Sequence, residues 1–266
     1  MSVYVITHKY LDTMPQLDTF YKWLYVGAYK TEDRREGYCY DDSGSENISK
    51  KNESFCELTG MYWIRHNCND DIKGLVHYRR FFTKNIWNED VAYYLSEKDV
   101  RKLLKKYDCI VSDRKYFSKK NIAENYRCLH HGKDLDLLEE IIKMNAPEYL
   151  DAFYDAMSKT YLFPYNMIIA KAEVFDAYTD WLLGILHKLE AVEDLNGYDA
   201  YQSRIYGFLS ERLLNVWLIK NDVLFVEKPT VQLGSRIRYK VRTELEKLFK
   251  HSLYFLAKMD DIGGKK

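Results

Sequence analysis

Short apolar runs alternate along the chain with longer segments of helical periodicity, which is the pattern of an α/β domain. The run at residues 3–6 is β-branched and ends in the polar triplet Thr7-His8-Lys9, which predicts a buried strand followed by a loop. Further strands are predicted over residues 24–28, 72–82, 108–113, 162–170 and 222–226. Helices are predicted over residues 55–64, 100–107, 135–144, 148–161, 173–189 and 202–220.

Two polar clusters bracket the predicted helix, turn and strand in the first third of the chain. They are Asp41-Asp42-Ser43-Gly44 and His77-Tyr78-Arg79-Arg80. Each falls at the end of a predicted element, where side chains can point into a crevice, so a site is expected there. The polar residues 31–51 predict a long loop of the kind that is usually functional or mobile. Ser54 and Glu57 have the spacing of a capping box for the helix that follows.

The predicted helix over residues 202–220 has two distinct faces. Its apolar face carries Ile205, Phe208, Leu209, Leu213 and Val216 at helical spacing. Arg204, Gly207, Glu211 and Asn215 fall in a line on the other side. A glycine inside a helix costs about 1 kcal/mol relative to alanine, so Gly207 indicates that another group approaches closely. A solvated face that tolerates glycine is the alternative.

Composition excludes several classes of protein. The chain has 266 residues and 47% hydrophobic content, which fits one large domain. Forty basic residues balance forty acidic ones, so no global charge favours nucleic acid as a partner. The five cysteines form no CxxC pair and indicate reduced thiols in a cytoplasmic protein. Neither a charged leader with an apolar run nor eighteen consecutive apolar residues is present, so we expect no secretion and no membrane span.

The C-terminal stretch differs in composition from the rest, which suggests a division into residues 1–233 and a basic extension at 234–266. From Arg236 onward there are nine basic and four acidic residues. An apolar stripe at helical spacing is formed by Leu245, Leu248, Phe249, Leu253 and Leu256. Such an amphipathic helix can lie on an anionic membrane surface. Packing on the domain or on a second subunit is the commoner use of such a helix.

Common catalytic motifs are missing, and the basic pair is the clearest remaining signal. The chain has no internal repeat, Walker loop, GxGxxG, HExxH or GxSxG motif, so nucleotide hydrolysis, dinucleotide binding and serine hydrolysis lose support. Arg79 and Arg80 could form a clamp for phosphate or carboxylate, or a structural salt bridge. The adjacent His130 and His131 would point to different helix faces, which disfavours a metal site and leaves contact with substrate.

Five ordered blocks resemble one known family. They are DDSGSENISKKN, CELTGMYWIRHN, GLVHYRRFF, YNMIIAKAEVFDAYTDWL and QSRIYGFLSERLLNVWL, and they span roughly residues 3–218. The chain is similar to a domain-of-unknown-function family from bacterial capsule and exopolysaccharide gene clusters, whose members are taken to be glycosyltransferases. The resemblance implies one α/β domain with a GT-A-like fold, with a nucleotide half and an acceptor half.

The resemblance also implies an activity. The expected reaction moves a hexosyl group from a UDP-sugar to a growing capsular or exopolysaccharide acceptor that is lipid-linked. Some relatives are associated with galactofuranose transfer. The expected location is the cytoplasm, with peripheral attachment to the inner face of the plasma membrane. The rival interpretation is a non-catalytic carbohydrate-binding or scaffold subunit of a polysaccharide assembly complex. A sugar phosphotransferase is weaker, because no phosphate-cradling glycine loop is present.

One departure from GT-A enzymes concerns the leaving group. Metal-dependent members place Asp-x-Asp at the end of a central strand, whereas the comparable strand here ends in the basic cluster. Either a hard cation or arginines can offset the charge of a departing diphosphate, so Arg79 or Arg80 is expected to stabilise UDP. Asp41 and Asp42 are the alternative, a cation site, so the need for a divalent metal is left open and no metal ligand is assigned.

An inverting transferase needs a carboxylate that takes the proton of the acceptor hydroxyl. Glu211 is the first choice for this base and Asp199 the second; burial would raise the base's pKa. Glu211 could instead be the salt-bridge partner of Arg79 or Arg80. The residues expected to bind the nucleotide sugar are Thr7, His8, Lys9, Asp41, Asp42, Asn47, His77, Arg79, Arg80 and Arg204. Those expected to contact the acceptor are Tyr126, His130, His131 and Asn166.

Overall fold

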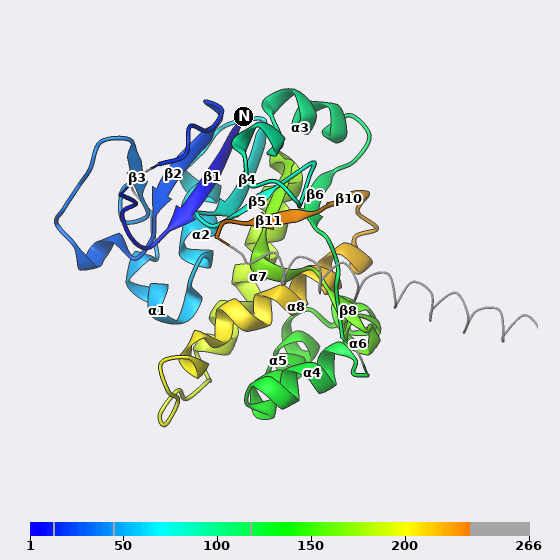
Figure 1. Cartoon of the computed structure of the whole chain (residues 1–266). Helices are drawn as coiled ribbons and strands as arrows, with labels where there is room; N and C mark the ends of the chain where they lie inside the picture. Colours follow the sequence, from blue (N-terminus) through cyan, green and yellow to red (C-terminus); the bar gives the residue numbers. More distant parts are fainter. Residues whose placement is uncertain (13, 45, 118, 235–266) are drawn as a thin grey trace, which may run out of the picture.

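A computed structural model describes residues 1–12, 14–44, 46–117 and 119–234, so the extension predicted at 234–266 lies outside the described residues apart from Gly234. The structure is an α/β domain built on one large sheet (Figure 1). Its strands are β1 (Ser2–Thr7), β2 (Tyr21–Tyr25), β3 (Tyr38–Tyr40), β4 (Ile72–His77), β5 (Arg80–Phe82), β6 (Cys109–Ser112), β9 (Ile168–Lys171), β10 (Phe225–Lys228) and β11 (Thr230–Gln232), and β7 (Lys115–Tyr116) pairs with β8 (Tyr161–Leu162) separately.

Eight α-helices are present in the described residues. They are α1 (Asn52–Phe55), α2 (Leu58–Asn67), α3 (Glu97–Leu104), α4 (Ile122–Leu129), α5 (Gly132–Asn145), α6 (Leu150–Ser158), α7 (Ala172–Glu190) and α8 (Ile205–Lys220). The short 3-10 segments η5 (Pro164–Asn166) and η6 (Gln202–Arg204) precede β9 and α8. Figure 1 shows α4, α5 and α6 grouped beside α8, away from β1, β2 and β3.

The direction of the strands gathers several chain turns at one edge of the sheet. The strand order is β10-β6-β9-β4-β1-β2-β3. Strands β3, β2, β1 and β4 are parallel, and β9 runs antiparallel between β4 and β6. The carboxyl ends of β1 to β4 and of β6 therefore meet the amino end of β9 at the same edge. Ligands of open α/β sheets bind at the carboxyl ends of the strands.

Alternating side chains of β1 enter two separate cores, as expected for a sheet that is covered on both faces. Tyr4 and Ile6 pack with the core that contains the helices α2 and α4 to α8. Val3 and Val5 pack with the second core, which includes α3 and the β5–β11 pair. Because both faces of β1 are buried, its register is fixed and Thr7 is held at the sheet edge.

Two predicted strands are interrupted, and both interruptions lie at the sheet edge. The strand expected at 72–82 turns back at Tyr78 and Arg79, so that His77 of β4 pairs with Arg80 of β5. The single predicted strand is therefore two antiparallel strands joined by a tight turn. The strand expected at 162–170 is interrupted by η5, where Tyr165 has φ of 78° and Asn166 has φ of 52°.

The region around residues 24–64 also differs from expectation. The predicted loop at 31–51 contains β3, and the strand expected at 24–28 is β2, which ends at Tyr25. The helix expected at 55–64 is divided at Cys56, which has φ of 52°. The predicted capping box is wrong, because the Ser54 hydroxyl donates to the carbonyl of Lys51 instead. The other predicted helices correspond to α3 and to α5 to α8, with shifted ends.

Two sequence expectations concern the environment of the chain. All five cysteines are free thiols in the structure. Among the described helices, none combines the length and the apolar character that a membrane crossing requires.

Candidate functional site

The loop after β1 is shaped by its own threonine. The Thr7 hydroxyl donates to the carbonyl of Lys9 at 2.6 Å and accepts from the Lys9 amide at 3.2 Å. Thr7 itself is buried, and its carbonyl accepts from the Val26 amide at 2.8 Å. The hydroxyl is therefore used to form the turn, and the turn exposes the side chains of His8 and Lys9 at the sheet edge.

Basic side chains gather around Tyr78, in the turn between β4 and β5. The Tyr78 ring lies 5.7 Å from the His8 ring and 5.6 Å from Lys9 Nζ. The Arg79 guanidinium carbon lies 5.4 Å from the same ring. Burial lowers the pKa of His8, and the positive charges of Lys9, Arg204 and Arg79 lower this pKa further. The four basic side chains therefore share one electrostatic environment, and we call them the basic group: His8, Lys9, Arg79 and Arg204.

No member of the basic group forms an ion pair with a carboxylate among the described residues. By contrast, Arg114 is paired with Glu227 and Arg34 with Asp42. Concentrated positive charge without carboxylate partners attracts anions. The sheet edge at the ends of β1 and β4 is thus suited to an anionic ligand.

Arg80 lies in a different environment from Arg79, because the turn separates their directions. The Arg80 guanidinium carbon is 4.4 Å from the centre of the Tyr165 ring. Its Nε is buried and has no hydrogen-bond partner in the described part of the chain. Arg79 is exposed in the turn, where its carbonyl accepts from the Leu233 amide at 2.9 Å. The expected clamp of two adjacent arginines is therefore better described as one exposed arginine and one stacked arginine.

Strained backbone converges beside the basic group. Non-glycine residues with positive φ in the described chain are Cys56, Tyr165, Asn166 and Asp222, and the first three belong to neighbouring segments of this edge. The Asn166 amide Nδ2 donates to Glu57 Oε1 at 2.7 Å and to the Gly207 carbonyl at 3.1 Å. Such conformations cost about 1–3 kcal/mol each and cluster at functional sites.

Glu211 is joined to this strained segment by a backbone hydrogen bond. The Tyr165 amide donates to Glu211 Oε1 at 2.6 Å, and the Tyr165 carbonyl is 2.7 Å from His77 Nε2. A carbonyl oxygen can only accept, so His77 Nε2 carries the proton. Glu211 Oε2 accepts from Arg212 Nη1 at 3.1 Å. The ion-pair partner of Glu211 is therefore Arg212, and the alternative of Arg79 or Arg80 is wrong.

The environment of Glu211 suits a proton acceptor. Burial raises the pKa of its carboxyl, the charge of Arg212 and the Tyr165 amide oppose this rise, and the charge of Glu57 adds to it. The side chain remains 22% exposed, so another molecule can approach it. A carboxylate with a raised pKa is a better base than an ordinary surface glutamate.

The start of α8 is packed against the strained turn at Cys56. A Cβ on Gly207 would lie 3.4 Å from both Cβ and Sγ of Cys56, so the group that approaches this glycine is that cysteine. Arg204 Nε contacts Cys56 Sγ at 3.2 Å. The alternative of a solvated face that tolerates glycine is wrong, because Gly207 and Asn215 of that line are buried.

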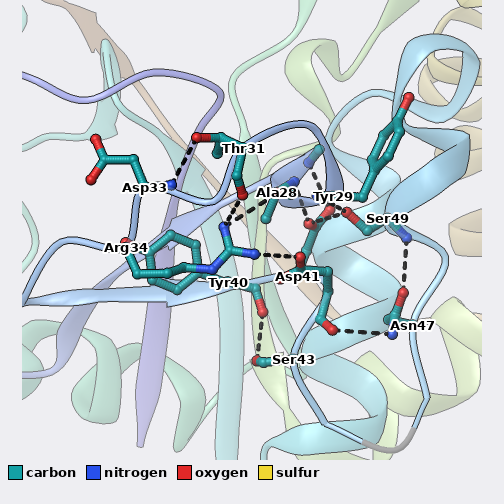
Figure 2. A network of polar contacts seen from close by, with 12 residues as sticks. Ala28, Tyr29, Thr31, Asp33, Arg34, Tyr40, Asp41, Ser43, Asn47 and Ser49 are labelled. Atoms are coloured by element: carbon teal, nitrogen blue, oxygen red, sulfur yellow. Dashed lines mark hydrogen bonds and ion pairs between the residues drawn. The ribbon is translucent and has the colours of Figure 1, made fainter.

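The side chains of Asp41 and Asp42 accept hydrogen bonds from donors of the protein itself. Asp41 is fully buried, and its carboxylate accepts from the amides of Gly27 and Ala28 and from the hydroxyls of Ser49 and Thr59. Figure 2 shows Asp41 with Ala28 and Ser49. Asp42 accepts from Arg34 at 2.6 Å. The exposed Asn47 donates to the Asp42 carbonyl at 3.3 Å. These residues shape the loop between β3 and α2, and Asp41 has little capacity left for a cation.

Asp199 also has a structural partner set. Its Oδ1 accepts from the amides of Tyr201 and Gln202 at 2.8 Å and 2.7 Å. These amides belong to the turn that enters η6, which leads into α8, so Asp199 holds this turn in place. The second choice for the base therefore fixes the start of the helix that carries the first choice.

The residues expected to meet an acceptor are divided between core and surface. Tyr126 is buried, and its hydroxyl donates to Asp134 Oδ2 at 3.1 Å. The His130 ring stacks 4.1 Å from Phe208 of α8 and its Nδ1 lies 3.1 Å from Gln202 Oε1. His131 is exposed and packs its ring 4.4 Å from that of Tyr198. His130 is therefore beside the start of α8, and the Tyr126 ring packs against the His130 ring at a distance of 4.8 Å between ring centres.

Two residues of the site escape sequence reasoning. Tyr165 joins His77 to Glu211 through its peptide groups, and Glu57 holds Asn166. For Tyr165 the sequence carries one visible signal, the preceding Pro164, because proline favours a turn. The left-handed conformation that directs both peptide groups is imposed by tertiary packing.

Across the described residues, no group of three or more histidine, cysteine, aspartate or glutamate side chains has a metal-binding arrangement.

The mixed, mostly parallel sheet, with its two faces packed into separate cores, defines an α/β protein. The chain belongs to the family described as a domain of unknown function, DUF4422, whose model matches residues 2–222. A search among curated proteins found no significant match.

A solved structure supports the fold. The apo structure of the WbbM bifunctional glycosyltransferase matches with a TM-score of 0.79 and 24% sequence identity. The match covers 88% of this chain and 45% of that chain, so this chain corresponds to under half of that protein. The two proteins share an architecture.

Proposed function

We propose that the protein is a glycosyltransferase that uses a nucleotide sugar as donor. The observation that carries the proposal is the basic group, in which His8, Lys9 and Arg79 surround Tyr78 at the carboxyl ends of β1 and β4 and no member has a carboxylate partner in the described chain. A nucleoside diphosphate is the ligand that brings two adjacent phosphates to such an edge. The family membership and the shared architecture with a glycosyltransferase support the same assignment.

Charge stabilisation is the proposed role of the basic group. The bond between the anomeric carbon and the diphosphate oxygen breaks, and negative charge develops on that oxygen. Fixed cations aimed at developing charge lower the barrier of such a step. Arg79 and Arg204 present guanidinium groups that can bind phosphate oxygens in pairs. Lys9, beside the same Tyr78 ring, adds a further positive charge, and His8 adds one when it is protonated.

Glu211 is proposed as the base that takes the proton from the acceptor hydroxyl. The hydroxyl oxygen attacks the anomeric carbon while its proton passes to the carboxylate, and UDP leaves with the bonding electrons. The backbone amide of Tyr165 holds the carboxylate in place at 2.6 Å from Oε1. Such proton transfer typically contributes about 10²–10⁴-fold to the rate.

The finer proposal concerns the two substrates. We propose UDP-sugar as the donor, with UDP-galactofuranose among those to test, and a growing capsular or exopolysaccharide acceptor that is lipid-linked. The acceptor would approach the side of the site where His130 stacks on Phe208. The catalysis would take place at the inner face of the plasma membrane.

A donor panel tests the proposed function directly. Purified full-length protein is incubated with UDP-glucose, UDP-galactose, UDP-galactofuranose and UDP-N-acetylglucosamine, with and without EDTA, and released UDP is measured. The proposal expects slow hydrolysis of one donor, and EDTA decides whether a divalent metal assists. Absence of UDP release and of binding for every donor would refute it. Polysaccharide synthesis that persists in cells with Glu211→Ala would favour a non-catalytic carbohydrate-binding subunit.

A further inference from the structure

Glu57 influences both a member of the basic group, Arg204, and the proposed base, Glu211, through its charge. Its Oε1 accepts from Asn166 Nδ2 at 2.7 Å. Its charge contributes to the raised pKa of Glu211, which places it within electrostatic range of that carboxyl. Its side chain is partly exposed, and in the described chain Glu57 forms no ion pair. One carboxylate oxygen is thus held by the protein while Oε2 has no protein donor there.

Arg204 lies close to Glu57 but does not neutralise it. Burial lowers the pKa of Arg204, but the contact with Cys56 Sγ and the charges of Cys56 and Glu57 raise it, and the net result is a raised pKa. Only Nε is used in that contact, and the terminal Nη atoms have no partner among the described residues. Because Cys56 directly precedes Glu57, this contact brings the unused donors of Arg204 into the neighbourhood of the unused acceptor of Glu57.

A buried amide oxygen gives a second, independent indication of a ligand. Asn166 is 1% exposed, and its Oδ1 has no hydrogen-bond partner in the described structure. The amide cannot be reversed, because Nδ2 already faces two acceptors, Glu57 Oε1 and the Gly207 carbonyl. An unpaired buried acceptor costs free energy that a hydroxyl donor or a bridging water recovers. Asn166 Oδ1 therefore lacks a hydrogen-bond donor among the described residues.

We propose that Glu57, Asn166 and Arg204 form the subsite that binds the hydroxyl groups of the donor sugar. A vicinal diol satisfies this arrangement: one hydroxyl donates to Glu57 Oε2, and the oxygen of its neighbour accepts from Arg204. The donor sugar is the occupant because Arg204 also belongs to the basic group, and a sugar ring linked to the diphosphate begins where the phosphates end. The inference rests on the proposed function.

Calorimetry on the full chain with Glu57→Gln tests the subsite. Glutamine keeps the acceptor for Asn166 and removes the charged acceptor for the sugar. The variant should weaken binding of the UDP-sugar preferred by the wild type by about tenfold or more, because hydrogen bonds to charged groups are strong. UDP, which has no sugar ring beyond its diphosphate, should bind with unchanged affinity. Glu53→Gln is the matched control, since Glu53 lies on the neighbouring α1 and pairs with Lys30 at the surface.

Donor analogues that lack one hydroxyl identify the contact. A deoxy UDP-sugar without the recognised hydroxyl should bind the wild type about tenfold more weakly than the parent donor. The same analogue should bind Glu57→Gln as well as the parent donor does, because the hydroxyl and Glu57 form one interaction that the substitution has already removed. Equal losses in both proteins for every deoxy analogue, or UDP and UDP-sugar weakened alike by Glu57→Gln, would overturn the subsite and leave the transferase assignment standing. A wild type that binds neither UDP nor any UDP-sugar would remove both.

Discussion

The backbone amide of Tyr165 donates to Glu211 Oε1 across 2.6 Å. The carbonyl of the same residue accepts from His77 Nε2 at 2.7 Å. A single residue in the left-handed conformation thus connects the end of the central strand β4 to the acid on α8. Because the backbone donor is fixed by the fold, the orientation of the carboxylate does not depend on a flexible side chain.

Glu211→Gln should reduce kcat by about 100-fold or more, because the amide cannot accept the acceptor's proton. The Tyr165 amide can still donate to the glutamine oxygen, so UDP affinity should stay within about threefold of the wild type. Steady-state kinetics and calorimetry measure the two quantities. Glu140→Gln on the exposed side of α5 is the control. A variant with full kcat would show that another group acts as the base.

The pH dependence of kcat follows from the raised pKa of Glu211. The base must be ionised, so activity should fall as pH falls through this pKa, at a pH above the ordinary glutamate value of 4.5. Removing the neighbouring charge with Glu57→Gln lowers the pKa and should move this acidic limb to lower pH. A limb that moves upward, or stays fixed in the variant, would contradict the proposed coupling.

Binding of a UDP-sugar should take up protons at His8. The pKa of free His8 is lowered from its ordinary value, chiefly by partial burial and then by the neighbouring cations, so the neutral ring is favoured. A bound diphosphate offsets those cations and raises this pKa. Calorimetry at pH 6.5 in buffers of different ionisation enthalpy should reveal the uptake, which should vanish at pH 8 and in His8→Asn. Equal uptake in His8→Asn would assign the proton elsewhere.

Asp41→Asn should destabilise the fold far more than Asp42→Asn. The buried Asp41 carboxylate accepts four hydrogen bonds, and an amide turns a donor toward some of them, at a cost of about 2 kcal/mol or more. Asp42 loses only its ion pair with Arg34, which is worth less than about 1 kcal/mol near the surface. Chemical denaturation measures both. Equal stability of the two variants would mean that Asp41 is not a structural anchor.

Much of the fold could be predicted from hydrophobic pattern. The apolar runs of β1 and β6 and the periodic segments of α5, α6, α7 and α8 are confirmed, because burial determines both the pattern and the element. The short strand β3 was missed because its three residues gain stability mainly from pairing with β2. The turn at Tyr78 and Arg79 was missed because no glycine or proline marks it.

The candidate site was predictable only in part. Polar residues after β1 and β4 could be expected at one edge from the rule for parallel strands, and the structure brings His8, Lys9 and Arg79 together there. The roles of Asp41 and Asp199 depend on backbone amides from other segments, and sequence spacing does not reveal such donors. The strained backbone at Cys56, Tyr165 and Asn166 is likewise a property of the packed fold.

The most direct test of the basic group is calorimetric titration of the full chain with UDP in the presence of EDTA. The wild type should bind UDP, and Arg79→Gln should weaken binding by about tenfold, because a charged donor to phosphate is lost. Arg101→Gln, which removes a cation already paired with Asp71 and Glu97, should leave the affinity unchanged. Absence of UDP binding, or equal affinity of Arg79→Gln and the wild type, would contradict the assignment of the basic group to the diphosphate.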